Sequence, residues 1–286
     1  MNKTVARQSV THFVAVLAPE PETLLDDRTY YGPMLQGLRD GLQEAGFFMR
    51  IVQCRHEYQQ EHLLSSAELY AGVVFLGATA ALEPFVCRVT AVAPGPKVLL
   101  DHRVEGLAAH SVRDDAETGM RLLAEHLLGL GHRRLAYVEM SDARANPWKR
   151  RGINRALSAA GLEELGKNSL AGCRDSFADV SAALDWLLSR TPRPSAVICS
   201  DDTRALLLLQ AAAEKGLRVP GDLSIAGFGD QAVRTGRSRA LTSVRVDPAM
   251  MGRRAAELIA AGPAEPADVL VAPELMPRAT TAAPER

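Results

Sequence analysis

The sequence is poor in the residues that build metal centres and disulfide frameworks. It has four cysteines in 286 residues, and they are widely spaced: Cys54, Cys87, Cys173 and Cys199. No two of them form a Cys-x-x-Cys pair, and no histidine lies at metal-ligand spacing from them. Zinc sites require such spacings. We therefore expect reduced, mostly buried thiols, no metal site and no cofactor.

Long apolar runs are also missing. No stretch reaches the roughly 18 apolar residues that a membrane-spanning helix needs. The N-terminal region has only a short apolar run, residues 13–18, before it turns acidic and proline-rich. A secretory signal peptide requires a longer apolar core and a small-residue cleavage site. We expect a cytoplasmic protein without a membrane partner, which argues against an exported solute-binding protein.

Neither sign of charge is in excess. Lysine and arginine together number 33, and aspartate and glutamate number 34. The chain therefore lacks the basic balance of a protein that coats nucleic acid, although local DNA contact remains open. Hydrophobic residues make up 47% and charged residues 23%, which is an ordinary globular composition. A chain of this length fits one α/β unit of two similar lobes.

Short apolar runs rich in β-branched residues alternate with longer amphipathic segments along the whole chain. Such alternation is typical of βαβ units and a parallel sheet. The expected strands are residues 12–19, 48–54, 71–77, 96–101, 133–140, 169–173, 195–200, 223–228, 241–246 and a terminal strand at 269–280. The expected helices are residues 31–45, 61–69, 114 or 115 to 128, 149–160, 178–189, 202–215 and 250–261, the last packed closely through Gly252.

Five segments of the second half stand in a recognisable order. They are GHRRLAYV (131–138), RRGINRALSAAG (150–161), CSDDTRALLLLQAAAEKGLRVPGDLSIAGFGD (199–230), LTSVRVDPAMMGRRAAELI (241–259) and ELMPRAT (274–280). In order and spacing they resemble the effector-binding core of the LacI/GalR family of bacterial transcription regulators, usually repressors. The resemblance covers roughly residues 12–280.

The resemblance implies an α/β fold of two doubly wound parallel-sheet lobes around a central ligand cleft, like a periplasmic binding protein. The expected N-terminal lobe comprises residues 12–140 and 245–263, and the C-terminal lobe comprises 141–244 and 264–282. A homodimer and a small polar effector, such as a sugar or sugar derivative, are the implied partners. Ligands of open parallel sheets bind at the carboxyl ends of the strands.

Residues 1–11 are expected to form a remnant of the hinge helix that enters the DNA minor groove in relatives. No helix-turn-helix precedes this segment in the sequence. Operator DNA is therefore expected as a partner only if the native protein carries such a head, because the residues that read bases sit on it.

The resemblance also points to ligand-binding residues on the first lobe. Tyr30 and Tyr31 match positions where relatives place residues against the ligand, and aromatic faces stack on apolar sugar or base surfaces. The alternative for both is packing at the start of a helix. Asp101 ends a strand, where a carboxylate can accept hydrogen bonds from two hydroxyls, unless it only stabilises its loop.

The second lobe supplies the remaining candidates. Relatives place an arginine three residues before Gly152, and here that position holds Lys149, followed by Arg150; both could instead be solvated charges. Phe177 falls near an aromatic that closes over the ligand, or it belongs to the core. One residue of the pair Asp201 and Asp202 is expected to cap a helix, and the other, preferably Asp201, to face the cleft.

Phe228 precedes the clearest departure from the family pattern. Relatives usually carry an acid directly after this aromatic residue, and here Gly229 stands in its place, followed by Asp230. Either Asp230 substitutes after a small loop shift, or the ligand differs from the usual sugar.

The leading hypothesis is a sensor without enzymatic activity, whose ligand favours one arrangement of the lobes. The alternatives are a headless regulator that acts through protein partners, a solute-binding protein of a transporter, and an enzyme. The enzyme is disfavoured because no nucleophile, base and oxyanion donors converge. The sequence leaves open the identity of the effector, repression against activation, and dimer against tetramer.

Overall fold

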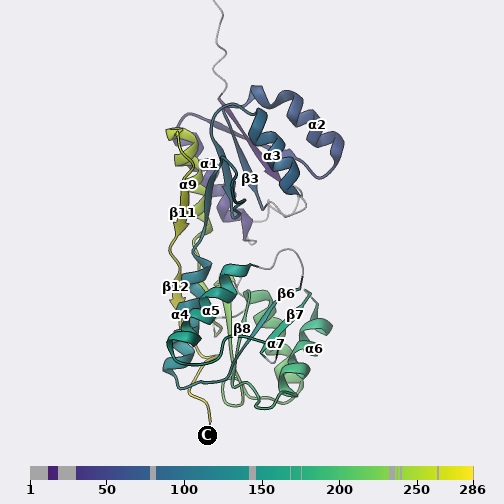
Figure 1. Cartoon of the computed structure of the whole chain (residues 1–286), viewed down its shortest axis with the longest axis vertical. Coiled ribbons are helices and arrows are strands. Elements are labelled where there is room, and N and C mark those ends of the chain that lie inside the picture. The colour runs from purple at the N-terminus through teal and green to yellow at the C-terminus, as the bar shows by residue number, and fades with distance from the viewer. Residues whose placement is uncertain are drawn as a thin grey trace, which may run out of the picture. The chain divides into compact units, whose positions relative to one another are not determined.

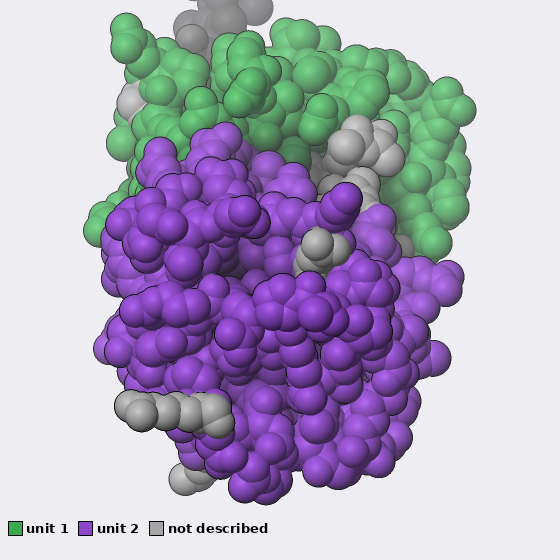
Figure 2. Space-filling view, turned by 60° about the horizontal axis from the view of Figure 1, so that its bottom comes forward, with its two compact units in different colours: residues 1–113, 248–271 green, residues 114–247, 272–286 purple. Residues whose placement is uncertain are grey.

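The computed structural model describes residues 12–18, 30–77, 82–141, 146–167, 169–174, 176–231, 236, 238, 240–262 and 264–285. The chain divides into two compact units, which Figure 2 distinguishes by colour. Unit 1 comprises residues 1–113 and 248–271, and unit 2 comprises residues 114–247 and 272–286.

Unit 1 is built on a six-stranded sheet in the order β11-β5-β4-β3-β1-β2. Neighbouring strands from β5 through β2 are parallel. The strands are β1 (Phe13–Ala18), β2 (Phe48–Gln53), β3 (Gly72–Leu76), β4 (Lys97–Leu100), β5 (His110–Asp114) and β11 (Asp268–Val271). The helices are α1 (Tyr31–Glu44), α2 (Glu57–Ser66), the 3₁₀ turn η2 (Ala67–Leu69), α3 (Glu83–Val92) and α9 (Pro248–Ala261).

Helices cover both faces of this sheet, as Figure 1 shows. Val14 and Val16 of β1 pack with the buried residues of α1 and α9. Ala15 and Leu17, which alternate with them, pack with residues of α2 and α3 on the other face. Successive side chains of a strand point to opposite faces, so a strand covered on both sides is apolar throughout. This explains the continuous apolar run at residues 13–18.

Helices α1 and α9 approach each other closely because of glycine. A Cβ atom on Gly252 of α9 would lie 2.0 Å from the carbonyl oxygen of Met34 in α1. No other residue has room at this position. The structure thus confirms that Gly252 allows its helix to pack closely.

Unit 2 repeats the plan with a sheet in the order β12-β10-β9-β8-β6-β7. Its strands are parallel except for β12, which runs antiparallel to β10. The strands are β6 (Leu135–Met140), β7 (Leu170–Cys173), β8 (Ala196–Cys199), β9 (Ser224–Gly229), β10 (Thr242–Arg245) and β12 (Glu274–Met276). The helices are α4 (Ala116–Gly129), α5 (Pro147–Ala159), α6 (Phe177–Leu188) and α7 (Asp202–Glu214).

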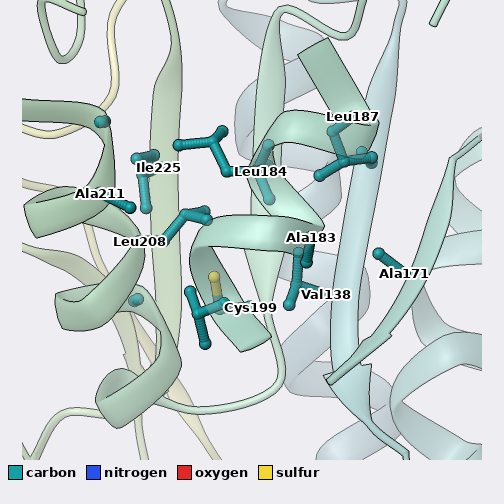
Figure 3. Close-up of a cluster of buried hydrophobic side chains, with 14 of the residues drawn as sticks. Val138, Ala171, Ala183, Leu184, Leu187, Cys199, Leu208, Ala211 and Ile225 are labelled. Carbon is teal, nitrogen blue, oxygen red and sulfur yellow. The ribbon is translucent and has the colours of Figure 1, made fainter. Parts of the chain in front are cut away.

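The core on one face of the second sheet is shown in Figure 3. Val138 and Cys199 of the sheet face Leu184 of α6 and Leu208 of α7, and all four side chains are fully buried. Helix α4 contacts strands β8, β9 and β10. The predicted fold class, two doubly wound lobes with parallel sheets, is therefore confirmed for each unit.

The boundary between the units differs from the predicted one. We expected the first lobe to run to residue 140, but unit 1 gives way to unit 2 after Arg113. The reason is that α4 packs on the second sheet: a Cβ atom on Gly119 would lie 2.9 Å from side-chain atoms of both Phe228 and Val244. The later segments are correspondingly 248–271 and 272–286, not 245–263 and 264–282.

The predicted terminal strand is in fact two strands, β11 and β12, which belong to different sheets. Strand β5 and helix α3 were not predicted. The expected hinge-helix remnant at residues 1–11 lies outside the described residues. Within the described part of the chain, every helix is too short or too polar to cross a membrane.

Candidate functional site

Tyr30 and Asp101 come together in unit 1 although 71 residues separate them. The Tyr30 hydroxyl donates a hydrogen bond of 3.1 Å to Oδ1 of Asp101 and lies 3.7 Å from the sulfur of Met251. Tyr30 directly precedes α1, and Asp101 directly follows β4. Asp101 has a φ of 66°, a left-handed conformation that aspartate tolerates better than most residues.

Tyr31 lies beside this pair. Its ring packs edge to face against Tyr30, with 5.3 Å between the ring centroids. Its hydroxyl oxygen lies 3.0 Å from where a Cβ atom on Gly77 would stand, at the end of β3. The structure therefore brings Tyr30, Tyr31 and Asp101 to the carboxyl ends of β3 and β4, where sheets of this type bind ligands.

Lys149 organises the corresponding edge of unit 2. It lies in the first turn of α5, and its Nζ donates a 2.7 Å hydrogen bond to the carbonyl oxygen of Ser200, just past β8. The same nitrogen stands 4.0 Å from the ring centroid of Phe228, near the end of β9. An ammonium over an aromatic face is attracted by the negative face of the ring. The Lys149 side chain thus connects the start of α5 with the ends of strands β8 and β9.

Arg150 contacts an acid that the sequence analysis missed. Its guanidinium lies 3.9 Å from Oε1 of Glu139, the second-to-last residue of β6. Burial raises the pKa of Glu139, and the charge of Arg150 partly opposes that rise. The available signal was an acid near the end of the otherwise apolar run LAYVEM (135–140).

The two adjacent aspartates do not take the roles we expected. Asp201 caps α7: its extended backbone precedes the helix, and its Oδ1 accepts a 2.9 Å hydrogen bond from the amide of Arg204. Its second oxygen pairs with the buried guanidinium of the same arginine. Asp202 is buried inside the first turn and accepts a hydrogen bond from the Ser243 hydroxyl. The prediction that Asp201 leaves capping to its neighbour was wrong.

Asp230 is held by two arginines. Its carboxylate, 6% exposed, accepts hydrogen bonds from Nε of Arg245 at 2.9 Å and from Nη1 of Arg278 at 2.7 Å. This pairing speaks against Asp230 as a substitute for the ligand-binding acid of relatives. It also explains the arginine of the ELMPRAT segment, which fixes the loop after β9.

Gly229 stands directly after Phe228, where the resemblance led us to expect an acid. Its φ is 113°, in a region that residues with a Cβ atom rarely adopt. An aspartate here would strain this backbone, so the replacement by glycine is built into the conformation of the loop.

Phe177 is the first residue of α6, and its half-buried ring packs against the core of Figure 3. This contact favours the core alternative. Among the described residues, no three histidine, cysteine or acidic side chains are placed to hold a metal ion. All four thiols are free, three of them buried, and burial raises the pKa of Cys54 to about 11.

Comparisons with known proteins agree with this architecture. Residues 124–281, more than half of the chain, match the periplasmic binding protein-like domain family. The chain is similar to the arabinose metabolism transcriptional repressor of Geobacillus stearothermophilus, with 32% identity over 57% of this chain and 46% of the relative. It is also similar to the transcriptional repressor PurR of Vibrio cholerae, with 31% identity over 57% of this chain and 49% of the relative. The match thus spans about half the length of these relatives.

Solved structures give the same result over nearly the whole chain. The transcriptional regulator CelR, in complex with cellobiose, has a TM-score of 0.80 and 27% identity, over 94% of this chain and 84% of that one. A LacI family transcriptional regulator from Mycobacterium smegmatis has a TM-score of 0.77 and 26% identity, over 95% and 100%. The chain belongs to the periplasmic binding protein-like domain family, in the form that LacI-family transcriptional regulators use for effector binding.

Proposed function

We propose that the chain senses a small polar effector for a LacI-type transcriptional regulator and does so as a homodimer. The observation that carries the proposal is the placement of the candidate residues at the carboxyl ends of strands in both units. Unit 1 offers Tyr31 and the Tyr30–Asp101 pair, and unit 2 offers Lys149 over Phe228. In open α/β sheets this edge is where ligands bind.

The chemistry of these residues suits a sugar or a sugar derivative. Asp101 can accept hydrogen bonds from hydroxyl groups, and the rings of Tyr30 and Tyr31 can cover an apolar sugar face. The names of the relatives agree, since one is an arabinose metabolism repressor and one was solved with cellobiose. Repression of an operator further requires a helix-turn-helix head, as in the curated relatives named for one.

Signalling follows from differential affinity. An effector that binds one arrangement of the subunits more tightly than another shifts the population toward it, whereas equal affinity shifts nothing. The effector therefore has to contact groups that move with respect to each other.

A thermal-shift screen tests the proposal. The purified protein is heated with sugars, sugar phosphates, sugar acids, nucleobases and amino acids, since a ligand at 100 times its Kd stabilises by about 2.7 kcal/mol. We expect a saturable shift with one chemical class, reduced by Asp101→Ala and kept by Asp222→Asn, which alters an exposed ion pair with Arg218.

The absence of a shift with every class, from a folded dimer, would contradict the sensor and favour a regulator that acts through protein partners. Sedimentation equilibrium measures the dimer directly. A monomer at all concentrations would contradict the homodimer.

A further inference from the structure

The acids at the ligand edge of unit 2 are engaged by the protein itself. Asp201 caps α7 and pairs with Arg204, and Asp230 is held by Arg245 and Arg278. Asp202 is buried under Ser243. Gly229, directly after Phe228, has a φ of 113°, which disfavours any side chain.

The cations of the same edge, Lys149 and Arg150, are not paired with carboxylates in this way. Among the residues that the structure describes, Nζ of Lys149 has no carboxylate within 4.0 Å, and its partners are a carbonyl oxygen and an aromatic ring. Arg150 has Glu139 at 3.9 Å, too far for a hydrogen bond. Burial disfavours the charged form of Glu139 by raising its pKa. The edge of unit 2 therefore presents two cations, Lys149 and Arg150, that no described carboxylate holds at hydrogen-bond distance.

A half-buried ammonium without a counter-anion is incompletely compensated. A carbonyl dipole and a ring face replace part of its hydration, but neither carries a negative charge. The Ser200 carbonyl and the Phe228 ring also fix Nζ in place. With respect to the described residues, Lys149 is thus a preorganised cation that lacks an anion.

We infer that the effector is an anion whose carboxylate or phosphate group pairs with Lys149, with Arg150 as the second cation. This inference rests on the proposed function and narrows it to sugar acids or sugar phosphates. A lysine ammonium binds either group as a compact point charge, which demands less of the anion's geometry than an arginine fork does.

Matched pairs of ligands test the inference by titration calorimetry. The pairs are galactose with galacturonate, and glucose with gluconate and glucose 6-phosphate, so the arms separate carboxylates from phosphates. We expect the charged member of a pair to bind at least tenfold more tightly, with an affinity that falls as salt rises. Equal or tighter binding of the neutral member would overturn the anion inference and leave the sensor proposal intact. If none of these compounds binds the folded protein but a neutral compound of the thermal-shift screen does, the anion inference fails and the sensor proposal stands. If no class of that screen binds, both fail.

Three variants separate the role of Lys149 from net charge. Lys149→Met should abolish the preference for the charged ligand, and Lys149→Arg should keep it. Lys167→Met removes the same charge from an exposed position before β7, at the opposite edge of the sheet, and should also keep the preference. If Lys167→Met weakens anion binding as much as Lys149→Met does, the specific pairing is overturned.

The stability of the unliganded protein supplies a second test. If Lys149 serves to bind an anion and not to stabilise the fold, Lys149→Met should change the Tm by no more than about 3 °C. A larger loss would show that the contacts with Ser200 and Phe228 are structural, and it would overturn the inference.

Discussion

The two units share a plan and differ in the chemistry they place on it. If the strands of each unit are numbered along the chain, both sheets have the spatial order second, first, third, fourth, fifth. In both, a strand from the C-terminal part of the chain (β11 or β12) follows at the edge. Both join a helix pair through a glycine: Gly252 meets α1, and a Cβ atom on Gly152 of α5 would lie 2.1 Å from a carbonyl oxygen of α4. At the carboxyl edge of its sheet, unit 1 has two tyrosines and an acid, whereas unit 2 has Lys149 and Arg150 beside acids that are paired within the protein. The shared fold determines where a ligand binds, and a few edge residues determine which ligand.

Burial of charge separates the units further. In unit 1 the described core clusters are apolar, and its buried polar side chains include His110. The buried charge of its sheet, Asp114, lies at the last residue of β5, where unit 2 begins. Unit 2 buries charged residues: Asp202, Arg204 and Asp230 are each at most 6% exposed. Buried charges need their partners, so unit 2 should be the more sensitive to loss of an ion pair, while both units should be equally sensitive to loss of a tight helix contact.

The largest expected effect comes from the helix contacts common to both units. Gly252→Ala in unit 1 and Gly152→Ala in unit 2 each place a methyl group against a backbone oxygen, and we expect each to destabilise by about 3 kcal/mol. Urea unfolding measures the change. Gly129→Ala is the control, because no atom lies within 4 Å of its Cβ position. A loss below about 1 kcal/mol in either variant would show that the two helix pairs are not equivalent.

The second effect should be confined to unit 2. Arg278→Met leaves the buried Asp230 with only the half-exposed Arg245, and we expect a loss of about 3 kcal/mol. Arg245→Met should cost about 1 kcal/mol or less, because its side chain is about half exposed and water screens the pair. Adding Asp230→Asn to Arg278→Met should recover part of the loss. Equal effects of the two single arginine variants would contradict the difference in burial.

The strands and most helices of both units could be predicted because apolar periodicity is a local signal. Residues 13–18 and 223–228 read as buried strands without any knowledge of their neighbours. Strand β5 could not be found in this way, because His110, Arg113 and Asp114 give it a polar sequence, and its place beside β4 is decided by tertiary pairing. The split of residues 269–280 into two strands depends likewise on which sheet each half joins.

The candidate site was predictable in position but not in pairing. The sequence placed Asp101 and Asp201 at strand ends, where the structure has them. It could not show that Asp230 pairs with Arg278, 48 residues away, or that Lys149 covers Phe228, because such contacts depend on the folded loops. Ion pairs between residues far apart in the sequence therefore could not be predicted before the fold was known.

A smaller effect concerns pH. The imidazole of His132 in unit 2 is buried between the hydroxyl of Ser195 and the carbonyl oxygen of Ala282, and burial lowers its pKa. The folded protein then binds fewer protons than the unfolded chain, so stability is full above about pH 6.5 and falls as the pH drops below it. We expect the free energy of unfolding to fall between pH 7.5 and pH 5.5 because of this residue.

Unfolding by urea at the two pH values measures this loss. His132→Asn should reduce the difference between the two pH values, even if it lowers stability at both. His62→Gln, which removes an exposed histidine of unit 1, is the control and should leave the difference as it is. An unchanged difference in His132→Asn would assign the acid sensitivity to other groups, such as His102 and His110 of unit 1, whose pKa values burial also lowers.

The smallest effect is expected from an ion pair of unit 1 that resembles the Asp230 pairs in distance but not in burial. Arg88 of α3 donates to Glu61 of α2 at 2.7 Å, with both side chains about half exposed. Exposed pairs contribute little because water and salt screen them, so Arg88→Ala should change stability by less than about 0.5 kcal/mol. Urea unfolding beside Arg278→Met makes the comparison direct, since both variants break a 2.7 Å contact. If Arg88→Ala cost as much as Arg278→Met, burial would not be what distinguishes the charges of the two units.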